Sequence, residues 1–431
     1  MIKIGICGFG TVGQSLVKHL SDHKDLIVNK TSLEFEIAYI ADRSIHKKTY
    51  PKNINVTTDV MDLASPGKVD ILVELIGDVE LTYPLIKNAI ENKIHIITAN
   101  KALLADKGTE LFELAKENDV FFGFEASVAG AIPIIRNLKT CMTNERLTSI
   151  HGIINGTCNY ILDRMSDSSL DFSNALEEAK ELGYAEADPS FDINGMDAAH
   201  KISILSSIAY GIRLPLDNIY VDGIEGISLM DIKYAKELGY KIKHVGITGL
   251  SDNSIECRVH PVLVPVKDIL AQVSGVMNSV ILKGDRFGTS MLYGHGAGGS
   301  ATASAVVSDL VDAINFISKK DLSICNHQNY NTVENLDIKD INDIECPFYL
   351  RIFAEDVSGV MAEITNILAN QNISIEAVTQ HESDRNNTTI PIVMITNSVK
   401  GDLINNAIKL MKNLRHVKEE VHFIRVLKSD E

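Results

Sequence analysis

The chain has 431 residues, of which 45% are hydrophobic and 23% charged, and its formal net charge is -16. This length exceeds what one hydrophobic core supports and predicts two or three domains of ordinary globular composition. The acidic excess argues against binding to nucleic acid, and no uninterrupted apolar run reaches the roughly 18 residues that a membrane-spanning helix needs.

The N-terminal stretch MIKIGICGFG lacks the basic region and cleavage site of a signal peptide and is interpreted as a strand. Six cysteines are scattered without a CxxC pair, which is typical of reduced, mostly buried thiols in the cytoplasm. The 13 histidines show no zinc-ligand spacing, so no transition-metal site is expected. We therefore expect a cytoplasmic protein without a membrane segment.

Residues 1–128 alternate short apolar strands with amphipathic helices, which predicts a parallel sheet covered on both faces. Such sheets bind ligands at the C-terminal ends of their strands. The expected strands are Ile2–Cys7, Phe35–Ala41, Val69–Leu75, Ile94–Thr98 and Val120–Phe124. The expected helices include Thr11–Leu20, Tyr83–Asn92 and Gly108–Glu117.

A glycine-rich motif joins the first strand to the first helix. It is GxGxxG, formed by Gly8, Phe9, Gly10, Thr11, Val12 and Gly13. The three glycines suit a tight turn, close approach of a pyrophosphate, and close packing of helix on strand. In this context the motif predicts a Rossmann-type doubly wound sheet that binds a dinucleotide at the N-terminus of the helix. The alternative is a glycine turn without a ligand.

The second expected strand ends at Asp42 and Arg43, which bear on the choice between NAD and NADP. A carboxylate there favours the ribose hydroxyl of NAD, whereas Arg43, supported by Lys47 and Lys48, can pair with the 2′-phosphate of NADP. We expect NADP(H) to be preferred and NAD(H) also accepted. Alternatively, Arg43 is only a solvated surface residue.

Lys101 follows the fourth expected strand and should stand at the ligand-binding edge of the sheet, although lysines at strand ends are also common on surfaces. Residues 129–325 then read as a mixed α+β domain. It contains expected helices near Asn174–Leu182, Gly195–Ala209 and Ala301–Ile317, and β-rich segments at Ile255–Val264 and Gly275–Leu282. The helix at 301–320 is expected to pack back on the first domain.

The segment Gly183–Lys201 contains the strongest chemical pattern. Four carboxylates lie close together with a proline and two glycines, and the segment leads into a helix. Asp197 and Lys201 are four residues apart and share one face of a helix that is otherwise apolar. A buried lysine beside a carboxylate is a natural proton donor for an alkoxide formed by hydride transfer, so Lys201, alone or together with Lys101, is the predicted donor. The alternative is a purely structural ion pair.

Residues 326–346 are polar and are interpreted as a linker to a third domain, 347–431. Its expected strands are Phe348–Glu355, Ile373–His381, Thr389–Thr396 and Val421–Leu427, and its expected helices are Gly359–Ala369 and Asp402–Asn413. The order βαββαβ predicts a ferredoxin-like sandwich.

The motifs together resemble homoserine dehydrogenase over essentially the whole chain, and the C-terminal domain resembles an ACT domain. The long signature Ala179–Lys201 is accompanied, in the right order, by GFGTVG, TANKALL, EASVAGAIP, GIINGTCNYIL and GAGGSATASAV. The resemblance implies reversible NAD(P)H-dependent reduction of L-aspartate 4-semialdehyde to L-homoserine, on the path to threonine and methionine.

Residue roles follow from the resemblance by position. It implies that Lys201 is the proton donor, that Lys101 is a second catalytic or cofactor contact, and that Gly156, Gly183 and Gly298 line the nucleotide cleft. The implied substrate contacts are Thr157, Tyr184, Glu186, Asp192 and Asp197. A sodium site is implied at Glu125, Val128, Gly130 and Ile132.

The resemblance also implies regulation and assembly. ACT domains pair and bind amino acids between subunits, so we expect a homodimer or homotetramer inhibited by threonine. The expected effector contacts are Asp356, Gly359, Val360, Asn372 and Ile373. The alternative is a dimerisation module without a ligand.

Two other functions remain alternatives. A phosphorylating semialdehyde dehydrogenase needs a thiolate, for which Cys158 is the candidate. A non-catalytic sensor of amino acids and nucleotides would not need Lys201.

Overall fold

Residues 1–128 form a six-stranded parallel sheet in the computed structural model, which describes residues 1–214, 216–251, 254–319, 336–381 and 389–428. The order is β3-β2-β1-β4-β5-β6, so the sheet is of the predicted Rossmann type. The strands are β1 Ile2–Cys7, β2 Phe35–Ala41, β3 Asn55–Thr57, β4 Ile71–Glu74, β5 His95–Thr98 and β6 Phe122–Gly123.

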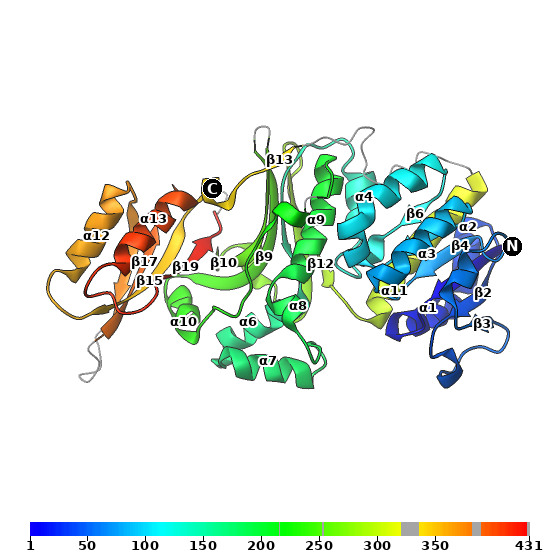
Figure 1. The fold of residues 1–431 in the computed structure, drawn as a ribbon, viewed down its shortest axis with the longest axis horizontal. Helices are drawn as coiled ribbons and strands as arrows, with labels where there is room; N and C mark the ends of the chain where they lie inside the picture. The colour runs from blue at the N-terminus through cyan, green and yellow to red at the C-terminus, as the bar shows by residue number, and fades with distance from the viewer. Residues whose placement is uncertain (215, 252–253, 320–335, 382–388, 429–431) are drawn as a thin grey trace.

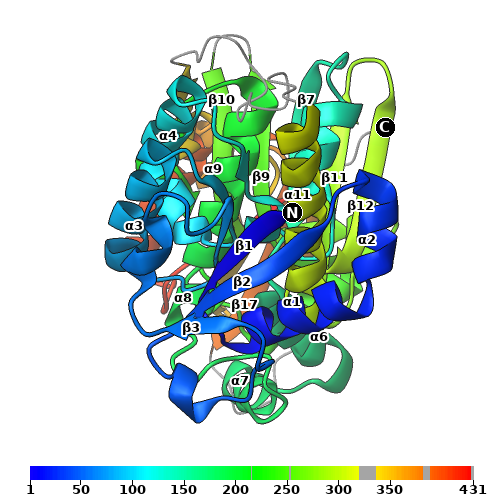
Figure 2. The ribbon, with the colours of Figure 1, turned by 90° about the vertical axis from the view of Figure 1, so that its right-hand side faces the viewer.

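Helices cover both faces of this sheet. Figure 2 shows α3 (Val79–Glu91) and α4 (Lys101–Glu117) on one side, and α1 (Thr11–Asp22) and α2 (Lys24–Thr31) on the other. Helix α2 was not among the expected helices. It has few apolar side chains, and in α2 only Ile27 and Thr31 are buried, so the sequence carries little helical periodicity there.

The long helix α11 (Gly299–Lys319) returns to the first domain and packs beside α1, sharing one hydrophobic core with it. By length and composition α11 is long and apolar enough to cross a membrane, but half of its most apolar window is buried within the protein. Its apolar side chains, including Val306, Leu310 and Ile314, pack in that core. We therefore interpret α11 as a core helix.

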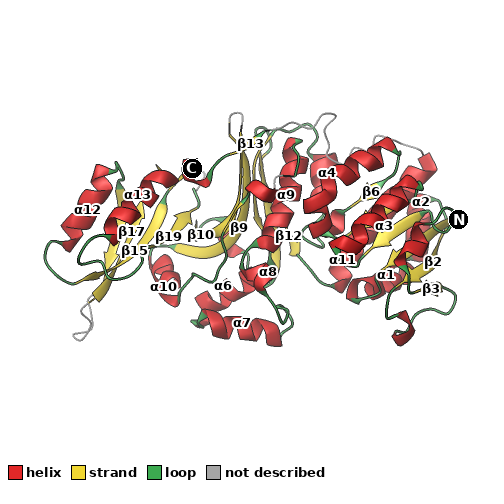
Figure 3. Ribbon diagram, in the orientation of Figure 1, coloured by secondary structure: helices red, strands yellow, loops and turns green. Residues whose placement is uncertain are grey.

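The middle domain carries a large sheet with helices along one side (Figure 3). Its strands are β7 Leu147–Ile153, β8 Tyr220–Val221, β9 Tyr240–Ser251, β10 Ser254–Pro265, β11 Met277–Gly284 and β12 Gly288–His295. Its main helices are α6 Gly156–Ser168, α7 Phe172–Glu181, α8 Ser190–Ile193, α9 Met196–Tyr210 and α10 Leu229–Glu237. Helix α9 packs against both α4 and β9, so it connects the first two domains.

The C-terminal domain has the predicted ferredoxin-like order. Its elements are β15 Phe348–Glu355, α12 Val360–Asn370, β16 Ile375–Gln380, β17 Thr389–Thr396, β18 Val399–Lys400, α13 Gly401–Lys412 and β19 His422–Val426. The sheet order β19-β15-β17-β16 continues the middle sheet, because β19 pairs with β10 in parallel. Figure 1 shows the resulting elongated molecule, with this domain at the end opposite the Rossmann sheet.

The stretch expected to be a linker, 326–346, is only partly described, since 326–335 lie outside the described residues. The described part contains two short strands. Strand β13 (Asp337–Ile338) pairs with β10, and β14 (Glu345–Cys346) pairs with β18. These pairings attach the described part of the segment to both neighbouring domains.

Candidate active site

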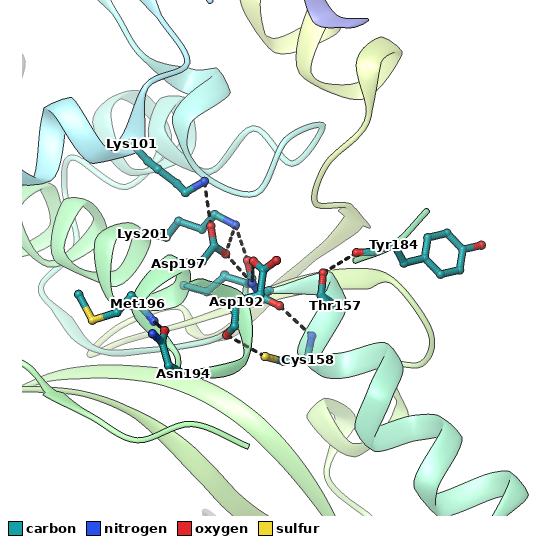
Figure 4. A network of polar contacts seen from close by, with 11 residues as sticks. Lys101, Thr157, Cys158, Tyr184, Asp192, Asn194, Met196, Asp197 and Lys201 are labelled. Carbon is teal, nitrogen blue, oxygen red and sulfur yellow. Dashed lines mark hydrogen bonds and ion pairs between the residues drawn. The ribbon is translucent and has the colours of Figure 1, made fainter. Parts of the chain in front are cut away.

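Three charged side chains meet between α4 and α9. The Lys201 ammonium donates hydrogen bonds to Asp197 Oδ2 and to the Ile154 carbonyl oxygen, both at 2.7 Å. Lys101 Nζ lies 2.9 Å from Asp197 Oδ1. One carboxylate therefore holds two ammonium groups, and Figure 4 shows both lysines directed at Asp197.

Helix α9 explains why Asp197 and Lys201 are buried. Every residue from Asp197 to Tyr210 is buried, and the positive φ of Gly195 just before the helix forms its N-terminal turn. Burial opposes ionisation of Asp197, but the charges of Lys201 and Lys101 outweigh it and hold the pKa of that carboxyl well below its ordinary value. The cluster therefore keeps a carboxylate flanked by two cations.

Asn155 links this cluster to a second carboxylate. Its side-chain amide donates to Asp192 Oδ1 at 2.7 Å and to Asp197 Oδ2 at 2.8 Å. Its Oδ1 accepts a hydrogen bond from the Cys158 amide, so the same side chain caps α6. Burial and the nearby charge of Asp197 raise the pKa of Asp192. Sequence analysis missed Asn155; an asparagine before a helix signals a cap but not this bridge.

The other expected substrate residues lie around the cluster. Thr157 Oγ1 donates to the Tyr184 carbonyl oxygen at 2.6 Å, which fastens the loop of Gly183–Pro189 to α6. The Tyr184 ring points away from the lysines in Figure 4, and Glu186 is exposed on that loop. Asp192 and Asp197 are thus brought together by the fold, whereas Glu186 stands at the surface of the loop.

The environment of Cys158 does not suit a nucleophile. The thiol is buried and donates a hydrogen bond to the Asp192 carbonyl oxygen at 3.1 Å. Burial, with the charges of Asp192 and Asp197, raises its pKa well above the ordinary value. A thiolate is the reactive form, so this thiol is poorly suited to form a thioester.

The glycine turn after β1 has the shape of a phosphate site. Gly8 has a φ of 95°, and a Cβ on Gly13 would lie 2.3 Å from the Gly8 carbonyl oxygen. A Cβ on Gly10, by contrast, would meet nothing within 4 Å. Gly13 is thus required by packing, while Gly10 leaves open space that a pyrophosphate fits.

A second helix begins beside this turn. A Cβ on Gly299, the first residue of α11, would lie 2.6 Å from Ser15 Oγ and 3.0 Å from Thr11 Cγ2. Gly298, which precedes it, has a φ of 119°. The N-termini of α1 and α11 therefore lie together, and both present backbone N–H groups that favour an anion.

Asp42, at the end of β2, is already engaged. Its Oδ2 accepts hydrogen bonds from the Phe9 amide and from Lys48 Nζ, both at 2.8 Å, and its Oδ1 accepts from Ser44. Burial opposes ionisation of Asp42, but these contacts hold the pKa of its carboxyl well below its ordinary value. Arg43 is exposed next to this carboxylate.

The expected cation loop is buried but lies outside the lysine cluster. The two carboxylate oxygens of Glu125 accept hydrogen bonds from the Ile135 and Arg136 amides at 2.9 and 2.7 Å. Among the described residues, none donates a hydrogen bond to the carbonyl oxygens of Val128 or Gly130, and no cluster of three metal-ligating side chains is found. Ile132 donates its amide to Ala129 and its carbonyl oxygen accepts from Ile134.

The expected effector residues lie around α12 of the C-terminal domain, and Figure 1 shows this helix far from α4 and α9. Asp356 and Asn372 are exposed, and Gly359, with a φ of 99°, caps α12 at its N-terminus. Val360 and Ile373 are buried. The structure places these residues at the two ends of α12.

Comparison with known proteins identifies three matched regions. Residues 8–125 match the model of the NAD binding domain of homoserine dehydrogenase, residues 133–311 match that of homoserine dehydrogenase, and residues 348–416 match that of the ACT domain. A homoserine dehydrogenase of Pseudomonas aeruginosa is 40% identical over 427 residues, which cover 99% of this chain and 98% of that protein.

Comparison with solved structures gives the same family as the comparison of sequences. A homoserine dehydrogenase from Thiobacillus denitrificans is 39% identical and superposes with a TM-score of 0.93, covering 99% of this chain and 98% of the other. A hyperthermophilic archaeal homoserine dehydrogenase in complex with NADPH is 29% identical with a TM-score of 0.62, covering 72% of this chain and 97% of the other.

Proposed function

The chain belongs to the homoserine dehydrogenase family of NAD(P)-dependent oxidoreductases, and we propose that Lys201 is the proton donor of its reaction. The reaction is the reversible reduction of L-aspartate 4-semialdehyde to L-homoserine, a step of amino-acid biosynthesis. The observation that carries the proposal is the buried ammonium of Lys201, held by Asp197 and Ile154. Membership of this family excludes the thioester-forming and non-catalytic alternatives.

The nicotinamide, when bound, supplies the hydride for the aldehyde carbon. Two of the three N–H groups of Lys201 are used within the protein, which leaves one for the substrate oxygen. That N–H donates its proton to the alkoxide as it forms, and the charge of Lys101, the second catalytic or cofactor contact, stabilises the same oxygen. Asp197 holds both lysines in place.

We assign the substrate's amino-acid end to the carboxylates beside the lysines. Asp192 and Asp197 present negative charge to the substrate ammonium, while Asn155 keeps the two carboxylates in a fixed relation. Tyr184 and Glu186 belong to the loop that Thr157, on α6, fastens through the Tyr184 carbonyl oxygen, and we propose that these three residues border the bound substrate. Gly156 lies at the start of α6, where a Cβ would meet the Val276 carbonyl oxygen at 2.7 Å.

We propose that NADP(H) is preferred and NAD(H) also accepted. Supporting this, Lys48 neutralises the Asp42 carboxylate, which reduces its repulsion of a 2′-phosphate, and Arg43 is exposed beside it. The related archaeal enzyme was solved with NADPH. The phosphates would lie on Gly8–Gly13, with Gly298 approaching from α11.

A sodium ion fits the loop of residues 125–132 only through its backbone. The carbonyl oxygens of Val128 and Gly130 accept no hydrogen bond from the described residues, so they are open to coordinate a sodium ion. Both oxygens of the Glu125 carboxylate, by contrast, already accept hydrogen bonds from backbone amides. We propose that such an ion would order the loop against Gly296, since a Cβ on Gly130 would lie 2.6 Å from the Gly296 carbonyl oxygen. Replacing sodium by tetramethylammonium should then lower the thermal midpoint.

The ACT domain implies binding of an amino-acid effector. We propose that the effector is threonine, bound near Asp356, Gly359, Val360, Asn372 and Ile373 in a homodimer or homotetramer. We also place the enzyme in the cytoplasm, since its described cysteines (Cys7, Cys141, Cys158, Cys257 and Cys346) are free thiols.

One assay tests the proposed function. Oxidation of homoserine is followed with NADP and with NAD in parallel, with and without threonine. We expect turnover with both cofactors, a higher kcat/KM with NADP, and inhibition by threonine. No turnover with either cofactor would contradict the activity; turnover without inhibition would contradict only the effector.

A further inference from the structure

A buried carboxylate, Glu74, lies outside the lysine cluster. It is the last residue of β4 and its side chain is fully buried. In the sheet it pairs with Cys7, the last residue of β1, and with Thr98, the last residue of β5. Because parallel sheets of this type bind their ligands at the carboxyl ends of the strands, Glu74 lies at the edge where the dinucleotide is expected.

The hydrogen-bond donors around Glu74 come from two different loops. Its Oε1 accepts from the Ile76 and Gly77 amides at 2.6 and 3.1 Å, and its Oε2 accepts from the Thr98 hydroxyl at 2.6 Å. Burial raises the pKa of this carboxyl, whereas the three donors act to lower it. Among the described residues no cation pairs with Glu74. A buried carboxylate without a cation is costly, which favours a functional role over a purely structural one.

The first loop, residues 75–78, lies against the glycine turn that follows β1. A Cβ on Gly8 would lie 2.7 Å from the Leu75 carbonyl oxygen. The Leu75 amide donates to the Cys7 carbonyl oxygen at 2.8 Å. By holding two amides of this loop, Glu74 fixes it beside the turn that would receive the phosphates.

The second loop leads to Lys101, the first residue of α4. Thr98 Oγ1 accepts a hydrogen bond from the Asn100 amide at 3.0 Å. Asn100 Oδ1 in turn accepts one from the Leu103 amide at 3.0 Å, which caps the helix. Glu74, Thr98 and Asn100 thus form a buried chain of hydrogen bonds, the Glu74 relay, that ends where α4 begins.

We propose that Glu74 and Thr98 are positioning residues, whose relay sets the place of the Lys101 ammonium and of the loop beside the glycine turn. A shift in the first turn of α4 moves Lys101, whose Nζ lies 2.9 Å from Asp197 Oδ1. A displacement of about 1 Å in a catalytic site can lower the rate by roughly 100-fold. The inference rests on the proposed role of Lys101 at the substrate oxygen.

Two substitutions at Thr98 separate its hydroxyl from its shape. Thr98→Val keeps the shape and removes the hydroxyl, so kcat should fall by roughly tenfold. Thr98→Ser keeps the hydroxyl and should recover most of that loss, although it removes a buried methyl group. Thr31→Val is the matched control, because it removes a buried hydroxyl that donates to the Ile27 carbonyl oxygen in the same domain. It should change kcat less than about twofold.

A double-mutant cycle separates positioning from general distortion. If the relay acts through Lys101, adding Thr98→Val to Lys101→Ala should change kcat less than about twofold. Glu74→Gln should also lower kcat by roughly tenfold. Unlike Thr98→Val, it should raise the Kd for NADPH, measured by fluorescence titration, because it also releases the loop beside Gly8. If Glu74→Gln does not fold, the Thr98 variants decide the question.

The failure of the inference can be told from the failure of the proposed role of Lys101. A kcat of Lys101→Ala near that of wild type would contradict that role and overturn the inference with it. A loss in Lys101→Ala with an unchanged kcat in Thr98→Val would overturn the inference alone. So would a Thr98→Ser variant as slow as Thr98→Val, an undiminished effect of Thr98→Val in the Lys101→Ala background, or an equal loss in Thr31→Val. An unchanged Kd for NADPH in Glu74→Gln would overturn the part that the relay plays at the glycine turn.

Discussion

Lys201 Nζ lies 2.7 Å from Asp197 Oδ2, one helical turn along α9, and the other oxygen of that carboxylate lies 2.9 Å from Lys101 Nζ. The ion pair within α9 joins residues four apart, whereas the pair with Lys101 crosses from the middle domain to the Rossmann domain. Asp197 therefore connects α4, which begins at Lys101 after β5, with α9, which carries the proton donor. Loss of its charge should affect both.

Asp197→Asn should lower kcat by about 10²–10⁴-fold, because the proton donor loses the group that orients it. The free energy of unfolding should fall by roughly 3–5 kcal/mol, as expected when one partner of a buried ion pair is removed. Steady-state kinetics and urea unfolding measure the two effects. Asp188→Asn, in the exposed loop before α8, is the control and should change neither; equal losses in both variants would contradict the role of Asp197.

Gly13→Ala and Gly10→Ala should separate packing from cofactor binding. The Gly13 substitution places a Cβ 2.3 Å from the Gly8 carbonyl oxygen, so it should destabilise the protein by about 1–3 kcal/mol. The Gly10 substitution meets no protein atom within 4 Å and should leave the thermal midpoint nearly unchanged, yet raise the KM for NADPH. Thermal unfolding measures the loss of stability, and steady-state kinetics at varied NADPH measure the KM. A normal KM in Gly10→Ala would argue against phosphate binding at this turn.

Arg43→Ala should reduce the ratio of kcat/KM for NADPH to that for NADH by roughly tenfold, the equivalent of about 1.4 kcal/mol. The reason is that Arg43 is exposed directly after Asp42 in the chain. Its substitution removes a positive charge that attracts the 2′-phosphate of NADPH. Lys30→Ala, an exposed lysine on α2, serves as the control. An unchanged ratio would mean that Arg43 is a surface residue without a role in selecting the cofactor.

Asp231 makes the stability of the junction between middle and ACT domains depend on pH. Its carboxylate accepts hydrogen bonds from Arg351 at 2.7 and 3.1 Å and from Tyr349 at 3.0 Å. Burial opposes ionisation of Asp231, but the contact with Arg351 outweighs it and lowers its pKa. A lowered folded-state pKa gives stability that is complete above the unfolded-state pKa of about 4 and is lost as the pH falls from there through the lower folded-state pKa.

Asp231→Asn should therefore cost roughly 3–5 kcal/mol at pH 7, and the difference from wild type should shrink as the pH falls below about 4, the unfolded-state pKa of the carboxyl. Urea unfolding at both ends of this range measures it. Asp343→Asn, which removes an exposed pair with Lys400, should have an effect below about 0.5 kcal/mol. A difference between Asp231→Asn and wild type that grows toward low pH would contradict the argument.

Local patterns predicted the Rossmann sheet well. The bounds of β1 and β2 agree with the expected strands because both are short apolar runs followed by turn signals. Strand β9 was not predicted, because Lys243 and His244 are consecutive polar residues and break the alternation of apolar and polar residues that is typical of a strand. Both are buried, and Lys243 is satisfied by Asn159 and the Val273 carbonyl oxygen, partners that are far away in the sequence.

The active site also contains some features that the sequence predicts and others that depend on how distant segments pack. The pair of Asp197 and Lys201 could be predicted because both residues lie on one helix with a spacing of four. The contact of Lys101 with Asp197 depends on the packing of α4 against α9, and the bridge through Asn155 depends on three separate segments.

The most direct test of the central claim is the kcat of Lys201→Ala, measured with Lys243→Met as the control for loss of a buried lysine. Lys243 is 1% exposed but contacts neither Asp197 nor Asp192. We predict that Lys201→Ala binds NADPH normally and loses about 10²–10⁴-fold in kcat, while Lys243→Met keeps its kcat despite a lower thermal midpoint. A kcat of Lys201→Ala within tenfold of wild type would contradict the assignment of Lys201 as the proton donor.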